Sequence, residues 1–478
     1  MLRFKTLLIC ATVGAVSFSV TPIWAQSEIR TKQYEEGGVY EGMFNDGVRH
    51  GNGTYTLPDG FSYTGQWVDG EIQGQGIAKY PNGSLFEGQF SAGKPNGQGT
   101  ISFADGGNYQ GDWLSGKITG QGTARYANGS VYSGGFKEAN HHGRGKLTTN
   151  SGFIYEGDWV DGAQSGQAKI TYANESTYAG AMLDGKRNGK GMITLKDGMT
   201  YDGDWSQDQI AGMGKLIDAN GEVYEGAFQN GERNGEGSVA YVNGDIYVGS
   251  FVQNERHGNG KFTSKDNHII EGDWVKGIVQ GRAKATYPDG SIYHGDYAAG
   301  KPHGLGVLTY ADGGRYSGDW VNGTIAGKGT ATFEDGTIYV GDFQNARNHG
   351  NGKITYPDGH VYEGTWVEGV KQGKGLELQP DGSLYDGMFK AGRPDGEGTL
   401  TLNNGFHYTG QWAGGKIEGM GVATFDNGDV YTGAFLAGKP EGTGKMEYKS
   451  GRVFYGIWAD GAEKEPLEEP TAETPSAQ

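Results

Sequence analysis

The sequence predicts an all-β fold: an elongated single-layer antiparallel sheet of stacked β-hairpins. Three observations predict it, namely the glycine content, an unbroken period of 23 residues, and alternation of aromatic and polar residues within each period. Of 478 residues, 91 are glycine and 12% are aromatic. So much glycine without the collagen period indicates a backbone that turns often, and the aromatic content argues against disorder.

Residues 1–25 are expected to be a secretory signal peptide. Arg3 and Lys5 precede an apolar stretch, and Ala25 and Gln26 flank the expected cleavage site. The apolar stretch, about fourteen residues, is short for a membrane span of about 20. The single cysteine, Cys10, would leave with the signal, so we expect no disulfide or thiolate chemistry in the mature chain. These features predict an exported protein, periplasmic or extracellular.

The remaining chain divides into three segments. Residues 26–39 form an N-terminal segment that ends in a half-repeat, because Tyr34 and Gly37 occupy the places of a second strand and its turn. Residues 40–461 hold nineteen 23-residue units. Residues 462–478 are acidic and proline-rich, and we expect them to be a disordered tail. One strand before the array, eighteen pairs and one strand after them predict about 38 strands.

The unit starting at Tyr63 shows why each repeat is expected to be a hairpin. Alternation in Tyr63-Thr64-Gly65-Gln66-Trp67 places Tyr63, Gly65 and Trp67 on one face of a strand, with Gly65 leaving a gap for a neighbouring ring. The glycine-rich segment from 70 to 76 is expected to be a turn, with a second strand over 77–80 and a further turn at 81–83. The glycine at the third position recurs in every unit, beginning Gly42, Gly65, Gly88 and Gly111.

Units of two types alternate. One type carries Trp at the fifth position and a small Ala on the partner strand, whereas the other carries Phe and a larger aliphatic residue. This volume matching predicts that the aromatic row is a structural core. The alternation slips once, between Phe228 and Phe251. The tryptophans of the array are Trp67, Trp113, Trp159, Trp205, Trp274, Trp320, Trp366, Trp412 and Trp458.

Units such as YEGMFNDGVRHGNGTYTLPDG, from Tyr40 to Gly60, resemble MORN repeats, and the resemblance covers residues 40–461. Departures are few: Ile270 replaces the leading Tyr, Met182 replaces an aromatic residue, and Glu175 and Asn267 replace a turn glycine. The resemblance implies scaffolding and self-association. Some chains of the family join such repeats to a catalytic domain, but residues outside this array offer none, so we expect a non-enzymatic protein.

Two columns of polar residues recur along the array at positions where a metal site could form. Five histidines directly precede the second fixed glycine, where Asn or Asp stands in other units, so we interpret the position as a turn with positive φ. Units of one type lie about 19 Å apart, which excludes a shared metal. An acidic column is interpreted as a solvated face, and we expect no cofactor or metal. The columns are His50, His142, His257, His303 and His349, and Asp112, Asp158, Asp204, Asp273, Asp296, Asp319 and Asp342.

The expected function is a scaffold that binds protein partners or a second copy of itself. The alternatives are a lipid or membrane-surface module and a carbohydrate or cell-wall binding protein. The net charge of −17 argues against nucleic acid and anionic headgroups. Because coverage of the aromatic face should be poorest at the central slip, we expect Phe228, Phe251, Ile270 and Trp274 to contribute to the partner surface.

Overall fold

The computed structural model describes residues 28–469, and every regular element in that range is a β-strand. The chain divides into two compact units, the first ending at Lys196 and the second beginning at Asp197. Within residues 28–469, no helix offers an apolar stretch long enough to cross a membrane. The expected signal cleavage between Ala25 and Gln26, and the last nine residues of the expected tail, lie outside the described residues.

The strands of the first unit are β1 (Arg30–Gln33), β2 (Val39–Asn45), β3 (Val48–Thr56), β4 (Ser62–Val68), β5 (Glu71–Lys79), β6 (Leu85–Ser91), β7 (Lys94–Ser102), β8 (Asn108–Leu114), β9 (Lys117–Arg125), β10 (Val131–Lys137), β11 (Asn140–Thr148), β12 (Ile154–Val160), β13 (Ala163–Thr171), β14 (Thr177–Leu183) and β15 (Lys186–Thr194). Those of the second unit are β16 (Thr200–Ser206), β17 (Gln209–Ile217), β18 (Val223–Gln229), β19 (Glu232–Ala240), β20 (Ile246–Val252), β21 (Glu255–Thr263), β22 (Ile269–Val275), β23 (Ile278–Thr286), β24 (Ile292–Ala298), β25 (Lys301–Thr309), β26 (Arg315–Val321), β27 (Thr324–Thr332), β28 (Ile338–Gln344), β29 (Arg347–Thr355), β30 (Val361–Val367), β31 (Val370–Leu378), β32 (Leu384–Lys390), β33 (Arg393–Thr401), β34 (His407–Ala413), β35 (Lys416–Thr424), β36 (Val430–Leu436), β37 (Lys439–Glu447), β38 (Val453–Ala459) and β39 (Ala462–Pro466).

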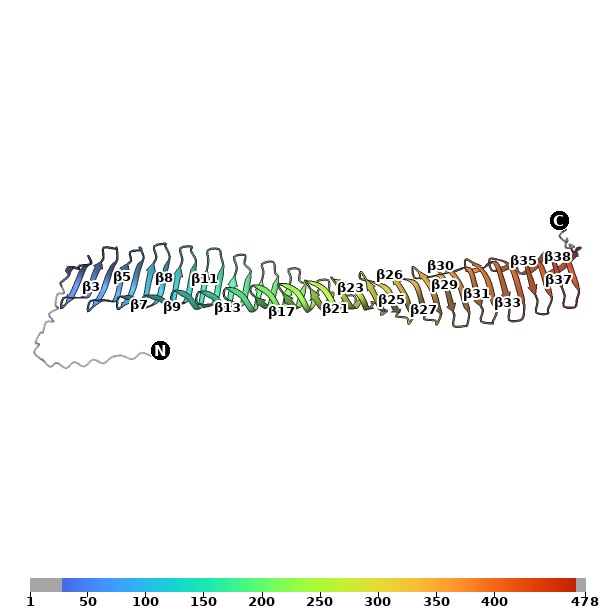
Figure 1. The fold of residues 1–478 in the computed structure, drawn as a ribbon, viewed down its shortest axis with the longest axis horizontal. Helices are drawn as coiled ribbons and strands as arrows, with labels where there is room; N and C mark the ends of the chain where they lie inside the picture. Colours follow the sequence, from blue (N-terminus) through green and yellow to red (C-terminus); the bar gives the residue numbers. More distant parts are fainter. Residues whose placement is uncertain (1–27, 470–478) are drawn as a thin grey trace, which may run out of the picture. The chain divides into compact units, whose positions relative to one another are not determined.

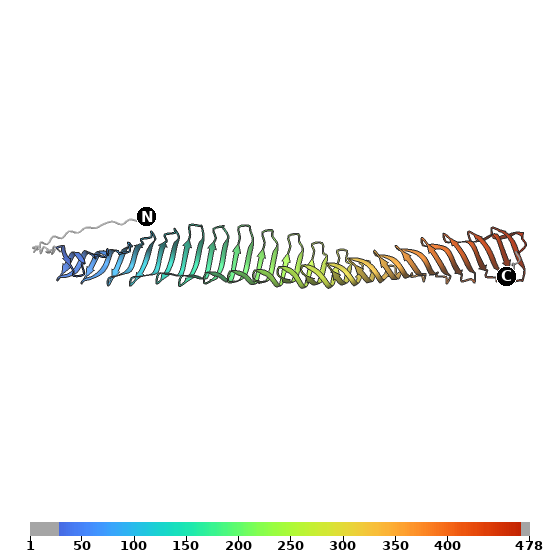
Figure 2. The same ribbon diagram turned by 45° about the horizontal axis from the view of Figure 1, so that its top comes forward.

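Within each unit, consecutive strands pair antiparallel in chain order, as the ribbons show (Figures 1 and 2). Each repeat is a hairpin whose first strand has seven residues and whose second has nine, as in β4 and β5. The all-β array of stacked antiparallel hairpins predicted from the sequence is therefore confirmed.

The turn inside each hairpin is tighter than the sequence suggested. The connection from β4 to β5 is only Asp69-Gly70, with φ of 50° and 91°, which is the left-handed pair of a type I′ turn. The expectation of a turn over residues 70–76 was wrong, because β5 begins at Glu71 and includes Gly74 and Gly76. Gly74 and Gly76 therefore do not interrupt the strand, and Gly76 leaves space for the Tyr63 ring.

A β-bulge lies in the middle of each complete hairpin. Gly65 pairs with Gly76 and Trp67 pairs with Ile72, so the register shifts between these two pairs. Gly74, in the bulged segment, has a φ of 67°, a conformation that favours glycine. This is the physical reason for the second fixed glycine of the repeat.

The C-terminal end differs from the expectation. β39 pairs with β38, so Ala462–Pro466 extend the sheet instead of beginning a disordered tail. This accounts for 39 strands in the described chain rather than the predicted 38. At the other end, β1 pairs with β2, and Tyr34 N–H donates to Gly38 O at 2.8 Å.

Candidate functional site

The aromatic residues form an edge-to-face ladder along one face of the hairpins, which we call the ring face. Tyr63 contacts Trp67 of its own strand with ring centroids 5.5 Å apart, and contacts Phe90 of the next repeat at 5.0 Å, at interplanar angles of 81° and 79°. Each repeat advances the sheet by two strands, or about 9.6 Å, and in most repeats one Tyr and one Trp or Phe fill that length. Tyr63 is fully buried and Trp67 is 3% exposed.

The leading tyrosine lies over a pair of glycines. A Cβ on either Gly65 or Gly76 would overlap the Tyr63 ring, and the ring's hydroxyl donates to Gln66 O at 3.1 Å. The gap predicted at Gly65 therefore exists, but the ring that fills it comes from the same strand and not from a neighbour.

The tryptophans expected to form a structural row are all buried core residues. Seven of them donate from Nε1 to a glycine carbonyl of the preceding repeat, as Trp67 does to Gly53 at 3.2 Å and Trp458 to Gly444 at 3.1 Å. These bonds tie successive repeats together. The sequence carried no signal for them, because the acceptor is a backbone atom.

Trp159 departs from this pattern. Its Nε1 has no hydrogen-bond partner among the described residues. Beside it, the His141 ring stacks on Tyr132 at 3.6 Å, meets Trp159 at 4.7 Å, and its Nε2 lies 2.6 Å from the Tyr126 hydroxyl. Burial lowers the pKa of His141 to about 4, so the ring is neutral in the fold near neutral pH.

The histidine column serves a different role from the predicted one. None of the five histidines has positive φ. Instead, the backbone N–H at the next repeat's tight turn points to the histidine Nδ1, at 3.5 Å from Asp69 to His50 and 3.4 Å from Asp161 to His142. Asn96 accepts the corresponding bond at 3.1 Å. The shared requirement is a hydrogen-bond acceptor that caps the neighbouring turn.

The acidic column is also more than a solvated face. Asp158 Oδ2 accepts from Gln167 N–H at 3.0 Å, and Asp319 Oδ2 accepts from Lys328 N–H at 2.8 Å, in each case at the bulge of the same hairpin. Gln66 does the same for Gln75 at 3.0 Å. These side chains accept a hydrogen bond from a backbone N–H that the bulge leaves without a partner on the neighbouring strand. Within residues 28–469, no group of three or more His, Cys, Asp or Glu residues is arranged to hold a metal.

The central set expected to form a partner surface is mostly buried. Phe228, Phe251 and Trp274 are 5%, 2% and 4% exposed, and each meets a tyrosine edge to face, so the ladder continues through the slip. The expectation of poor coverage there was wrong for these three rings. The two adjacent Phe units each still place a Phe ring against their leading tyrosine. Ile270 is different, because it is partly exposed and lines a hollow.

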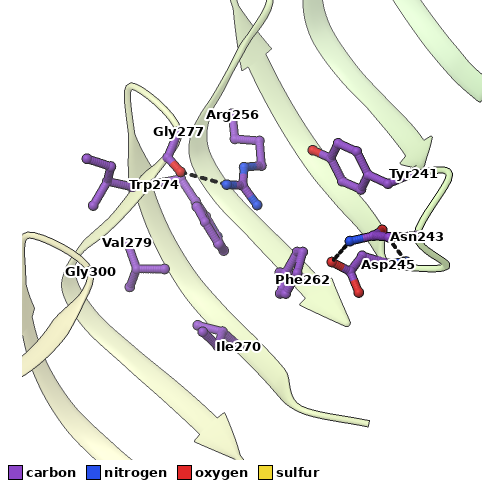
Figure 3. Close-up of a pocket in the computed structure, with 11 residues that line it drawn as sticks. Tyr241, Asn243, Asp245, Arg256, Phe262, Ile270, Trp274, Gly277, Val279 and Gly300 are labelled. Atoms are coloured by element: carbon purple, nitrogen blue, oxygen red, sulfur yellow. Dashed lines mark hydrogen bonds between the residues drawn. The ribbon is translucent and has the colours of Figure 1, made fainter. Parts of the chain in front are cut away.

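That hollow, of about 450 Å³, surrounds the guanidinium of Arg256 (Figure 3). Arg256 lies over the Trp274 ring with its Cζ 4.4 Å from the centroid, and its Nη2 donates to Gly277 O at 2.8 Å. Phe262 and Ile270 line the side away from that bond. We call this the central hollow.

An equivalent hollow of about 320 Å³ lies in the first unit, and we call it the N-terminal hollow. Arg49 lies over Trp67 with its Cζ 4.4 Å from the centroid, and its Nη2 donates to Gly70 O at 3.1 Å. Tyr55 takes the place of Phe262. Each of these residues stands nine repeats before its counterpart in the central hollow.

Two cations at the same repeat position elsewhere on the ring face, Arg233 and Lys371, are paired with carboxylates. Arg233 Nη2 lies 2.7 Å from Glu222, and Lys371 contacts Glu377, whose Oε1 is also 2.9 Å from His360. Glu377 and Lys371 are 13% and 15% exposed, so each neutralises a charge that burial would otherwise penalise.

Comparison with known proteins identifies the repeat. The family model described as MORN repeat matches eighteen consecutive segments, from residues 40–62 to residues 431–451. No curated protein matches the chain.

Several solved structures are similar over parts of the chain. The TCP10 domain of CPAP from Danio rerio is 13% identical with a TM-score of 0.21, over 46% of this chain and 93% of that one. The TCP domain of SAS-4 from Drosophila melanogaster, solved with a proline-rich motif of Ana2, is 16% identical with a TM-score of 0.22, over 33% and 89%. Virginiamycin B lyase from Staphylococcus aureus is 11% identical with a TM-score of 0.11, over 56% and 94%.

Similarity at these scores carries no argument about function. The family model, in contrast, matches most of the chain, and its segments coincide with the hairpins described above. The chain belongs to the MORN repeat family.

Proposed function

We propose that this chain is an exported, non-enzymatic scaffold that binds protein partners or a second copy of itself. The proposal rests on a difference between the two faces of the sheet, of which one is buried and the other exposed. Apart from the two hollows, the ring face is closed by its own side chains, whereas the opposite face, which we call the outer face, presents alternating side chains to solvent. A sheet that needs no partner to cover its core is free to use its other surface for contact.

The outer face carries apolar side chains among charged ones. On β20, Ile246, Val248 and Val252 are 46%, 52% and 41% exposed, and Val248 lies between Ser238 and Lys261 of the neighbouring strands. Contiguous exposed apolar side chains rimmed by polar ones favour a protein contact. Each hairpin contacts mainly its neighbours, so the array offers such contacts at fixed intervals.

The carbohydrate alternative loses its main support, because the rings that would stack on sugars are engaged edge to face with one another. No observation favours the lipid alternative over protein binding. Export is supported by the pattern of residues 1–25 alone. Mass spectrometry of the protein from its exporting compartment should find an N-terminus at Gln26, and a chain beginning at Met1 would contradict export with cleavage.

The binding proposal is tested by photo-crosslinking in intact cells. A photoreactive residue replaces Val248 on the outer face, and a control carries it at Asn230, in an exposed turn. We expect protein adducts, with this chain or another, from the first position and few from the second. Purified chain that stays monomeric in light scattering at all concentrations, with no adduct from either position, would contradict the proposal.

A further inference from the structure

The N-terminal and central hollows share one feature, an arginine that has no carboxylate partner among the described residues. Arg49 and Arg256 each use one Nη2 to hold a backbone carbonyl, and within residues 28–469 neither forms an ion pair. Arg233, at the same repeat position, is neutralised by Glu222. A guanidinium has five N–H donors in a planar fork, so each of the two hollows retains donors that no carboxylate occupies.

We propose that the N-terminal and central hollows are two equivalent binding sites for a peptide segment that presents a carboxylate beside an apolar side chain. The carboxylate takes the free edge of the arginine, and the apolar side chain rests on the aromatic rings. This inference rests on the proposed function, because it names the chemistry of the protein partner.

The ring contacts fix the position of the charge. Arg256 lies over Trp274 and within 5.4 Å of the Phe262 ring centroid, and Arg49 is held the same way by Trp67 and by Tyr55 at 5.0 Å. Stacking immobilises the guanidinium before a ligand arrives, which lowers the entropic cost of binding. A flat cation on an aromatic wall also leaves its edge, and not its face, open to a partner.

Two acidic side chains in the hollows, Asp245 and Glu36, are engaged elsewhere. Asp245 accepts from Lys265 N–H at 3.0 Å and from Asn243 Nδ2 at 2.8 Å, and Glu36 accepts from the Tyr55 hydroxyl at 3.0 Å. They do not neutralise the arginines. Their negative charges repel further charge on a ligand, which favours one carboxylate per site over a phosphate.

The shape of the hollows favours a peptide over a free small acid. Their volumes, about 450 and 320 Å³, suit one or two side chains. Ile278 in the lining of the central hollow is 50% exposed, so the hollow is shallow and would leave a small molecule largely in solvent. A peptide continues along the face beyond the hollow, and its neighbouring residues add contacts.

The origin of the central hollow supports its assignment as a site. Ile270 replaces the leading tyrosine of the repeat, and Ala283 stands opposite Gly272 where most repeats have glycine. The two changes together remove a ring and fill the space beneath it. The result is a hollow beside Arg256 with an apolar floor.

The test uses the full chain and two fluorescent synthetic peptides of equal length, one alternating Glu with Phe and one alternating Gln with Phe. We expect the Glu peptide to bind at two sites per chain, and the Gln peptide to bind at least about tenfold more weakly, as loss of a charged hydrogen bond implies. Arg49→Gln and Arg256→Gln should each remove one site, and the double variant both. Arg233→Gln is the matched control and should keep both sites.

Circular dichroism shows whether each variant retains its strands, and Arg256→Lys, which keeps the charge but not the fork, should bind with intermediate affinity. Equal binding of the two peptides, unchanged binding by the double variant, or an equal loss in the Arg233 control would overturn the proposal. If the double variant still yields the outer-face adducts at Val248, the scaffold function stands and only the ligand assignment fails.

Discussion

At the scale of single residues, the repeat is organised by the space over each glycine pair. Tyr63 lies across Gly65 and Gly76, and the same arrangement recurs with Tyr109 over Gly111 and Gly122. Where the tyrosine is absent, at Ile270, an alanine takes the glycine position. Ala168 stands at the glycine position opposite Gly157, yet Tyr155 is still fully buried. Glycine is therefore the usual partner of the ring, and one alanine is accommodated beside Tyr155.

Gly76→Ala should destabilise the hairpins on either side of it by about 1–3 kcal/mol, the usual cost of overfilling a packed core. The added Cβ meets the Tyr63 ring, which cannot retreat because Trp67 and Phe90 hold its edges. Chemical denaturation followed by tryptophan fluorescence measures the change. Ala283→Gly is the control, since no tyrosine lies over that pair, and should cost less than half as much. Equal losses would show that the ring is not the cause.

Residue identities alone revealed which columns matter but not what they do. The histidine column was found from its spacing, yet its role depends on a hydrogen bond that His50 accepts from the backbone N–H of Asp69, nineteen residues later. That contact exists only once the register between repeats is fixed. Backbone acceptors such as Gly53 O leave no trace in a sequence for the same reason. The sequence could not show that Arg49 and Arg256 lack a carboxylate partner, because that depends on which side chains come close in the fold.

At the scale of strands, the ends of the array are built to resist further pairing. β1 has four residues and includes Arg30 and Lys32, and β39 carries Lys464, ends at Pro466 and contains a register shift against β38. Short length, charge, proline and bulges are the means by which edge strands avoid pairing with other chains. The sequence predicted a solvated tail over Ala462–Pro466, because the acidic residues and prolines of this segment are typical of disorder and its stretch of strand is very short.

Replacing both Lys464 and Pro466 with Val should expose a pairing-competent edge and produce concentration-dependent multimers through β39. Dynamic light scattering should report particles larger than those of the wild-type chain, while the far-ultraviolet circular dichroism keeps its β signature. The same valine substitution at Lys439, within the paired strand β37, is the control and should not change particle size. Unchanged size in the double variant would mean that the edge is protected by some other means.

At the scale of the whole molecule, the buried tyrosines should make the fold sensitive to alkali. Burial raises the pKa of Tyr63, Tyr132, Tyr339 and Tyr431 from 10.0 to about 12. The folded state thus holds protons that the unfolded state releases. Their stabilising contribution is complete below pH 10 and is lost as the pH rises towards about 12.

We expect the β signal to collapse cooperatively over that pH range, together with the rise in tyrosinate absorbance. Phe86 occupies the tyrosine position in one repeat and meets Trp113 at 5.0 Å, so Tyr63→Phe should fold normally and move the transition slightly upward. Absorbance that titrates fully near pH 10 before the β signal changes would show that the rings are accessible to water.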